Sequence, residues 1–469
     1  MFIDDIRHDF YNILLGNRVL LLVHYDVDAI CTCKILQSLF KCDNISYTLV
    51  PVGDVNELKT AYEENNEEIK YVVLVNCGGT VDLVDVLQPE EDVVFFVLDA
   101  HKPTDVCNVY SDGQVHMLSF IIDIFFTDLT EFYHSLEAIV ERRRARRAWE
   151  ERRHTLLFNY TQFSYYGKPS ALVALELSWR ASRCGVGAVW AGAVAAAAAI
   201  ALCLRAPAQA LLDADALHRK VASGQRTSHV VLEKDVCLPL YRWWSVEAAL
   251  RHAPALAPHL KLHSLAGGTR LRQLLADMGF PLQQARQSYR SMDVELRRSL
   301  LTSLEAAAAK HRLPTPSHAA FLLRRPHCPP AAAQDVVYAI CGLIEHETIP
   351  PPEGFQLSLS ALDPSPGAAE PYRLGVASAQ RALEAVAGLV NQTLSARRLH
   401  LAGPFSYFIV QEVGPFFMLL SDTRTDSPPN GTLLRLLLIN LIKSLLLQNT
   451  TQAQQKSNYL SAQTAQTKQ

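Results

Sequence analysis

Acidic, amide and imidazole side chains follow three apolar runs within the first hundred or so residues. They are His24, Asp26, Asp28, Asn76, Asp99 and His101. Carboxylate oxygens together with imidazole nitrogens are a ligand set that suits Mn²⁺ or Mg²⁺. Two such ions can clamp the attacking and leaving oxygens of a phosphoryl displacement. If these side chains meet, the chemistry that their types indicate is metal-assisted phosphodiester hydrolysis.

The elements around these residues predict that they do meet. Four apolar segments of strand length, at 19–24, 45–52, 71–76 and 93–98, alternate with helical segments. Strands that are apolar throughout and are separated by helices are typical of a parallel sheet covered on both faces. In such a sheet, ligands bind beyond the carboxyl ends of the strands. The six residues are therefore expected at one rim of an α/β domain.

The order of these residues is similar to the motifs of the DHH phosphoesterases, which include the RecJ single-strand exonucleases. Asn76 stands where the second motif has Asp, and Ala100 stands where the third motif has its middle His. The departures predict a vestigial rim with no catalytic residue, no metal site and no cofactor, or at most one residual divalent ion. An active manganese-dependent phosphodiesterase or exonuclease is the alternative. In a purely structural interpretation, Asp28 only caps the helix that follows it, because a side-chain oxygen satisfies free amide donors in the first turn.

A closer resemblance covers most of residues 1–420. The chain resembles the cell division cycle protein forty-five family, itself a degenerate DHH family, in residues 26–40, 47–52, 81–103, 240–250, 275–293, 334–345 and 403–412. The resemblance implies a non-enzymatic subunit of the eukaryotic replicative helicase, acting in initiation and elongation of DNA replication in the nucleus. The implied partners are the MCM hexamer, the GINS complex, replication initiation factors and single-stranded or fork DNA.

Two departures from this family affect the expected architecture. A long acidic linker usually precedes the arginine-rich helix of the family, and here about twenty mostly apolar residues take its place. After about residue 421 the chain no longer resembles the family's DHHA1-like domain. The expected fold class is thus α/β, with a parallel-sheet DHH-like domain, an all-helical middle and a truncated DHHA1-like region.

Composition shifts along the chain give the expected segments. They are a DHH-like domain at 1–118, a charged linker with an arginine-rich helix at 119–155, a helical region at 156–355, a partial DHHA1-like region at 356–447 and a disordered tail at 448–469. The proline-rich residues 314–330 and 348–372 are expected to be loops. A strand pair is expected at 405–411 and 416–420, and an apolar helix at 433–447.

Charge is distributed unevenly along the chain. Residues 1–118 hold 7 Lys and Arg against 20 Asp and Glu, a net charge of −13, while the remainder has a net charge of +10. Any contact with nucleic acid is therefore expected from the basic remainder. Residues 142–153 carry seven arginines, which suit a nuclear-import signal, a phosphate contact or a solvated helix face.

Composition also bears on partners and surroundings. About half of the residues (49%) are hydrophobic, which excludes a wholly disordered chain. The ten cysteines are scattered along the sequence, which favours reduced thiols over a disulfide framework. Residues 186–204 lack charge but are rich in alanine, so we expect a packed helix rather than a membrane span. Leu282, Tyr289 and Trp244 are the candidate partner-binding residues of the helical middle.

Overall fold

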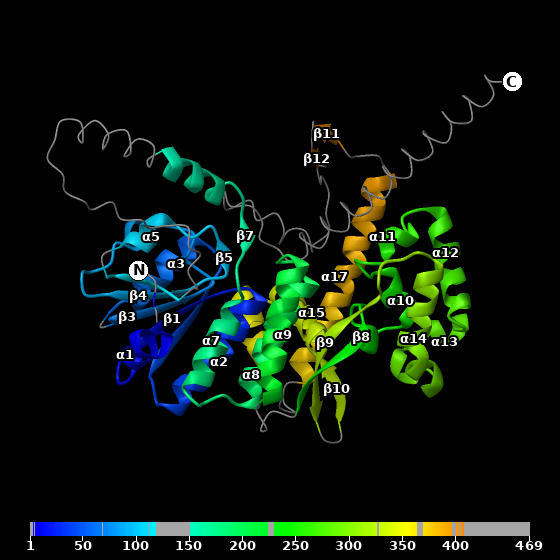
Figure 1. Cartoon of the computed structure of the whole chain (residues 1–469), viewed down its shortest axis with the longest axis horizontal. Coiled ribbons are helices and arrows are strands. Elements are labelled where there is room, and N and C mark those ends of the chain that lie inside the picture. The colour runs from blue at the N-terminus through cyan, green and yellow to red at the C-terminus, as the bar shows by residue number, and fades with distance from the viewer. Residues whose placement is uncertain are drawn as a thin grey trace, which may run out of the picture. The chain divides into compact units, whose positions relative to one another are not determined.

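The computed structural model of the chain describes residues 3, 5–67, 69–111, 113–118, 151–223, 229–325, 328–363, 369–395, 400–402 and 405–407 (Figure 1). It divides into two compact units, Met1–Ala216 and Leu217–Gln469. Most of the expected linker at 119–155, the expected helix at 433–447 and the expected tail at 448–469 lie outside the described residues.

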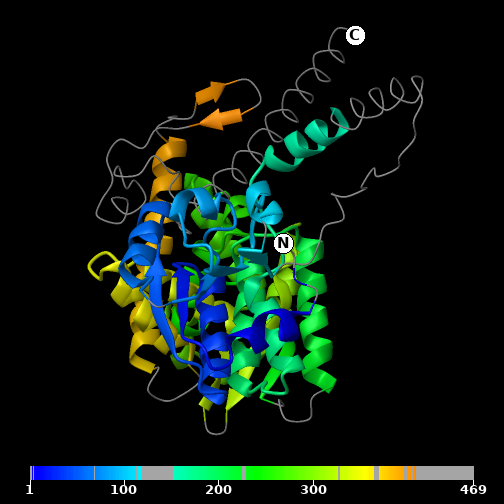
Figure 2. The same cartoon turned by 90° about the vertical axis from the view of Figure 1, so that its left-hand side faces the viewer.

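A five-stranded parallel sheet forms the centre of the first unit, in the order β2-β1-β3-β4-β6. Its strands are β1 Val19–His24, β2 Tyr47–Val52, β3 Tyr71–Val75, β4 Val94–Leu98 and β6 Val115–Met117. Val19 pairs with Tyr47 on one side and with Tyr71 on the other. The predicted α/β class with a parallel sheet is confirmed, and β6 is an additional strand that the apolar pattern did not reveal. In Figure 2 the blue elements of this unit face the viewer.

Aspartates start the helices that follow the strands. The elements around the sheet are η1 Ile6–Tyr11, α1 Asn12–Leu14, α2 Val27–Cys42, α3 Val55–Asn65, α4 Leu83–Leu87 and α5 Val106–Tyr110. Asp26, Asp54, Asp82 and Asp105 are the N-caps of the last four, and each accepts a hydrogen bond from a backbone N–H of the first turn. Capping of this kind satisfies orphan donors and fixes where each strand ends and each helix begins.

Two later helices belong to the same unit as the sheet. These are α7 Ser170–Arg180 and α8 Val186–Ala201, and they follow a helical stretch at 151–161. Both pack on α2, and a Cβ at Gly192 of α8 would lie 2.7 Å from Leu175 of α7. Small side chains thus let the two helices approach closely. The compact unit extends to Ala216, whereas the sequence predicted a boundary at residue 118.

The alanine-rich segment behaves as the sequence predicts. The α8 helix buries seven of its alanines together with Trp190, and these residues contribute to the core of the first unit. No helix among the described residues is long and apolar enough to cross a membrane.

The middle of the chain is not all-helical, and this prediction was wrong. A three-stranded antiparallel sheet, in the order β10-β9-β8, consists of β8 Val230–Val236, β9 Ser317–Arg325 and β10 Cys328–Ala332. Residues 314–330 had been expected to form a loop because of their prolines. Pro329 and Pro330 lie on β10, which is an edge strand and therefore tolerates residues without an N–H.

Most other described elements of the second unit are helices. They are α9 Pro207–Ser223, which contains the unit boundary, η2 Tyr241–Trp243, α10 Val246–Arg251, α11 Ala257–Leu260, α12 Leu265–Asp277, α13 Leu282–Arg286, η3 Tyr289–Ser291, α14 Val294–Lys310, α15 Ala333–Ile344, α16 Pro351–Leu362 and α17 Ala369–Ser395. The α16 helix occupies a segment that the sequence predicted to be a loop. A helix forms there despite its prolines, since Pro351 lies in the first turn, where proline is tolerated.

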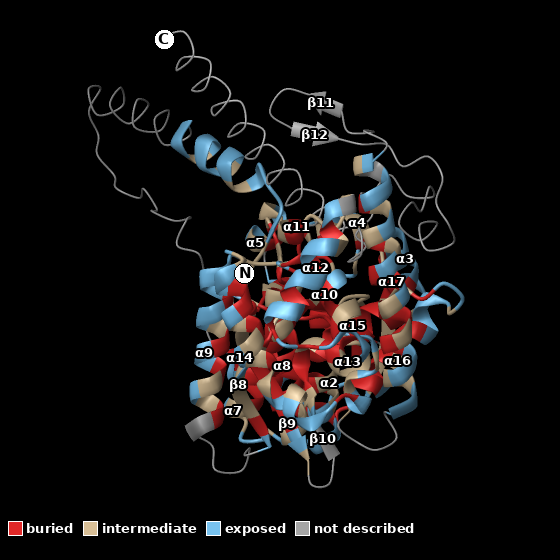
Figure 3. Cartoon of the chain, turned by 90° about the vertical axis from the view of Figure 1, so that its right-hand side faces the viewer, coloured by how far each residue is buried: buried red, intermediate tan, exposed pale blue. Residues whose placement is uncertain are grey.

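Glycines allow two of these helices to pack against each other. A Cβ at Gly342 of α15 would lie 2.4 Å from the carbonyl oxygen of Gly375 on α17, so only glycine fits. In Figure 3 the buried residues gather in the interior, and the outer faces of α12 and α17 are largely exposed.

A short hairpin ends the described part. The β11 strand, His400–Ala402, pairs antiparallel with β12, Phe405–Tyr407. The expected strand at 405–411 is thus described only as far as residue 407, and its expected partner at 416–420 lies outside the described residues.

Candidate functional site

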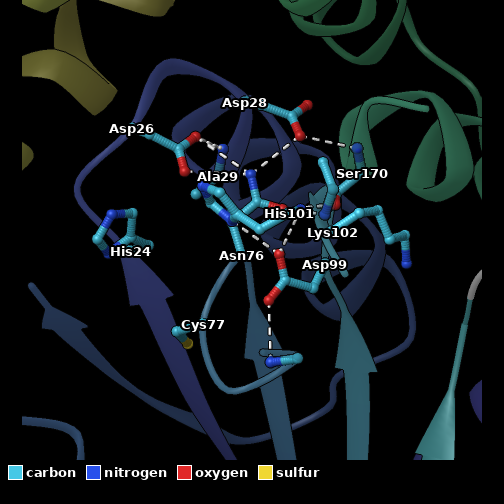
Figure 4. A network of polar contacts seen from close by, with 12 residues as sticks. His24, Asp26, Asp28, Ala29, Asn76, Cys77, Asp99, His101, Lys102 and Ser170 are labelled. Carbon is cyan, nitrogen blue, oxygen red and sulfur yellow. Dashed lines mark hydrogen bonds and ion pairs between the residues drawn. The ribbon is translucent and has the colours of Figure 1, made fainter. Parts of the chain in front are cut away.

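The carboxyl ends of β1, β3 and β4 bring all six residues of the predicted rim together (Figure 4). His24 ends β1, Asp26 caps α2, and Asp28 lies in the first turn of that helix. Asn76 directly follows β3, while Asp99 directly follows β4. Beyond Asp99, the strand β5 His101–Lys102 pairs with β7 Tyr165–Tyr166. We refer to these six side chains as the rim cluster.

Asn76 lies at the centre of the rim cluster. Its Nδ2 donates hydrogen bonds to Oδ1 and Oδ2 of Asp26, at 3.2 and 3.1 Å, and to Oδ2 of Asp28 at 3.0 Å. Its φ of 52° is in the left-handed region, which Asn adopts more readily than most residues. One neutral amide group therefore holds two carboxylates together.

Asp28 also accepts hydrogen bonds from the backbone at the start of α7. Its Oδ2 accepts from the N–H of Ser170 at 2.8 Å, and its Oδ1 accepts from the N–H of Ala171 at 3.0 Å. The Ser170 hydroxyl donates to Oδ1 of Asn76 at 2.6 Å, and the N–H of Ala100 donates to the same oxygen at 3.1 Å. The buried Ser170 was not among the predicted site residues, because nothing in its local sequence connects it to a rim 94 residues away.

Asp99 is at the centre of a second set of hydrogen bonds in the rim cluster. Its Oδ2 accepts from the N–H of Gly79 at 2.9 Å, and its Oδ1 accepts from the N–H of His101 at 2.8 Å. The Nδ1 of His101 lies 2.8 Å from the same Oδ1. A Cβ at Gly79 would lie 2.6 Å from Oδ2 of Asp99, so glycine is needed for this approach.

The protonation equilibria follow from burial and pairing. Burial, and then the charge of Asp26, raise the pKa of Asp28 to about 6, although its hydrogen bonds oppose the shift. Burial also opposes ionisation of Asp99, but the charge and hydrogen bonds of His101 hold the pKa of Asp99 below its usual value. Burial disfavours protonated His101, yet Asp99 raises the pKa of His101 to about 9. Burial lowers the pKa of His24, so this imidazole is the neutral member.

These contacts fit a metal ion poorly. Both oxygens of each of the three aspartates already accept hydrogen bonds from the chain itself. A cation between Asp26 and Asp28 would have to displace the Asn76 amide. Among the described residues, no group of three or more His, Cys, Asp or Glu is arranged to hold a metal ion. The geometry supplies neither of the two open positions that paired ions need.

Comparisons with known proteins identify the family of this chain. The CDC45 family profile matches residues 19–124 and 133–365, well over half of the chain. The chain belongs to the CDC45 family. It is 35% identical to the cell division control protein 45 homolog of Mus musculus and 34% identical to that of Homo sapiens. Each comparison covers 90% of this chain and 81% of the relative.

The fold is likewise that of the family. The crystal structure of CDC45 from Entamoeba histolytica is similar with a TM-score of 0.70 at 19% identity, covering 95% of this chain and 83% of that one. Membership of the CDC45 family makes the chain a DNA replication factor, as the resemblance implied.

The three candidate partner-binding residues of this CDC45 family member differ in exposure. Leu282, on α13, is 38% exposed. Tyr289 packs against the helical core, with its ring 5.0 Å from that of Tyr241. Trp244 is half-buried and stacks on His252, with ring centroids 5.0 Å apart and an interplanar angle of 7°. Of the three, Leu282 offers a partner the most accessible apolar side chain.

Proposed function

We propose that the chain is a non-enzymatic subunit of the replicative helicase that bridges the MCM hexamer and the GINS complex in the nucleus. Family membership supports the role in replication. The observation that carries the non-enzymatic part is the Asn76 amide, which donates to both Asp26 and Asp28. A phosphodiesterase of the DHH type needs these carboxylates open to metal ions, and here they hold the fold together.

The proposal includes the absence of a cofactor. Binding even one residual ion between Asp26 and Asp28 would break the Asn76 hydrogen bonds at 3.0–3.2 Å and leave its buried amide unsatisfied. Loss of a buried hydrogen-bond partner costs about 1–3 kcal/mol. The rim cluster is then a structural joint between strands β1, β3 and β4 and helix α7. DNA at the fork and replication initiation factors are further partners of the proposed subunit.

Assembly tests the proposal directly. The tagged full chain should retain purified MCM hexamer and GINS in a pull-down at physiological salt. Leu282→Asp should weaken retention, because it places a charge on an exposed apolar site of α13. Leu374→Asp is the matched control, since Leu374 on α17 is 37% exposed. A different result would overturn the assignment of the interface to α13. If Leu282→Asp leaves retention unchanged, and a folded Asp26→Asn/Asp99→Asn variant loses it, the interface lies at the rim.

An activity assay tests the alternative. The full chain should not hydrolyse single-stranded DNA or a phosphodiester model substrate in MnCl₂. Turnover that Asp26→Ala abolishes would identify the chain as an active phosphodiesterase instead.

A further inference from the structure

The free edge of the parallel sheet lies beside a hollow on the first unit. The β2 strand pairs with β1, and within the described residues no strand lies on its other side. The hollow has a volume of about 690 Å³ and lies between the carboxyl-terminal half of α2 and residues 44–47, where the chain enters β2. Phe40 and Ile45 form its apolar floor, and both are buried.

The ladder register shows which groups β2 presents at this edge. The N–H of Val19 donates to the carbonyl oxygen of Ser46 at 3.0 Å, and Val19 pairs with Tyr47. In a parallel ladder, backbone groups alternate between the two sides of a strand. Tyr47, Leu49 and Pro51 therefore direct their backbone groups away from β1. Proline is tolerated at position 51 because an N–H there would not reach β1.

One face of α2 forms the wall of the hollow. Lys34, Gln37, Ser38 and Lys41 recur at the spacing of a single helix face, and all four line the hollow. Ser38 and Lys41 are exposed, while Lys34 and Gln37 are half-buried. This face is polar and basic, and the hollow that it lines reaches β2 at Tyr47.

Basic side chains line this hollow although the domain as a whole is acidic. Of the 7 Lys and Arg in residues 1–118, Lys34 and Lys41 line the hollow, and Arg18 reaches Thr48 of β2 at 3.4 Å. The nearby Asp43 accepts from Tyr11 at 2.6 Å and from Arg183 at 3.1 Å, so its charge is already compensated. A basic spot thus lies on a domain whose net charge is −13.

We propose that this edge and hollow bind an acidic, extended segment of a partner protein, which adds as a strand to β2. The outward backbone groups of Tyr47 and Leu49 supply the main-chain hydrogen bonds, and Lys34 and Lys41 select acidic side chains. This site is separate from the rim cluster, because it lies at the start of β2 and the end of α2. It does not depend on the proposal for MCM and GINS.

Binding of a defined peptide to the full chain tests this proposal. The probe is a fluorescein-labelled, end-blocked peptide of eight residues that alternates Glu and Val, followed by fluorescence anisotropy. Lys34→Glu/Lys41→Glu should weaken its binding at least about tenfold. Lys59→Glu/Lys70→Glu makes the same charge change at exposed lysines of the same unit and should leave the affinity within about twofold.

Two further measurements separate strand addition from charge attraction alone. Leu49→Pro removes an outward N–H and leaves pairing with β1 intact, so it should weaken peptide binding in a chain with an unchanged melting temperature. A peptide N-methylated at alternate residues should also bind more weakly. Equal binding of both peptides, equal binding by all variants, or no saturable binding up to about 1 mM would overturn the proposal. Preferential binding of an oligothymidine through Lys34 and Lys41 would overturn it as well.

Discussion

At the scale of single residues, the Asn76 amide lies between two carboxylates and donates hydrogen bonds to both. Its two N–H groups serve Asp26 and Asp28, and its oxygen accepts from Ser170 and Ala100. A neutral donor cannot cancel two charges as a metal ion does. Burial, and after it the remaining repulsion from Asp26, raise the pKa of Asp28 to about 6.

Asn76→Asp tests this account. The substitution keeps a residue type that tolerates the φ of 52°, but it puts a third carboxylate beside Asp26 and Asp28. We expect the free energy of unfolding to fall by about 2–4 kcal/mol, measured by urea denaturation. Added MnCl₂ should restore part of the loss in the variant, because an ion then replaces the missing donors.

Asn44→Asp provides the control, since Asn44 has a φ of 53° and is exposed. This control should change the stability by less than about 0.5 kcal/mol. An Asn76→Asp chain as stable as the parent would contradict the account. So would stabilisation of the parent chain by MnCl₂.

The ion pair between His101 and Asp99 predicts a pH dependence. The folded pKa of His101 is about 9, above the value of 6.5 for an unperturbed histidine. Its contribution to stability is therefore complete below pH 6.5 and is lost as the pH rises through 9. We expect the free energy of unfolding to fall by about 3 kcal/mol between pH 6.5 and pH 9.5. His101→Asn should flatten this slope, whereas His8→Asn, at an exposed histidine, should retain it.

At the scale of elements, apolar patterning predicted the parallel sheet and its rim but missed features that depend on distant partners. Uninterrupted apolar runs revealed β1, β3 and β4, because both faces of these strands are buried. The edge strand β2 is mostly half-buried, but its sequence is apolar enough to be recognised as well. The half-exposed β8 carries Glu233, Lys234 and Asp235 and lacks such a run. The prolines of β10 argue against a strand unless its edge position is known.

The same limit applies to the candidate site. Strand ends predicted which polar side chains would converge, and the structure brings all six together. Ser170 lies at the start of a helix far along the chain, so its contact with Asn76 depends on how α7 packs. Local sequence could not reveal this contact.

Ser170→Ala tests the joint between the rim cluster and α7. The substitution removes a buried hydrogen bond of 2.6 Å to Asn76 and keeps the backbone N–H that binds Asp28. The free energy of unfolding should fall by about 1–2 kcal/mol, and α7 amides should exchange faster with solvent. Ser178→Ala, at another buried serine of α7, should affect exchange less. Equal effects of the two variants would mean that the hydroxyl of Ser170 adds nothing specific.

At the scale of the whole molecule, charge divides the chain into an acidic part and a basic part. Residues 1–118 have a net charge of −13 and repel phosphate, whereas the remainder has a net charge of +10. In the described second unit, the α12 helix carries Arg270 and Arg272, both of them exposed. A single-stranded DNA partner of the proposed helicase subunit would thus bind the basic remainder.

Arg270→Gln/Arg272→Gln should weaken the binding of an oligothymidine to the full chain about tenfold at low salt, measured by fluorescence anisotropy. The slope of log affinity against log salt concentration should also shrink by about 1.4, because two phosphate contacts are lost from a single strand. Lys59→Gln/Lys70→Gln removes the same charge from exposed positions of the acidic domain and should change neither quantity. If this control weakens binding while the α12 variant does not, the DNA path runs over the acidic domain, and net charge is a poor guide to where the strand lies.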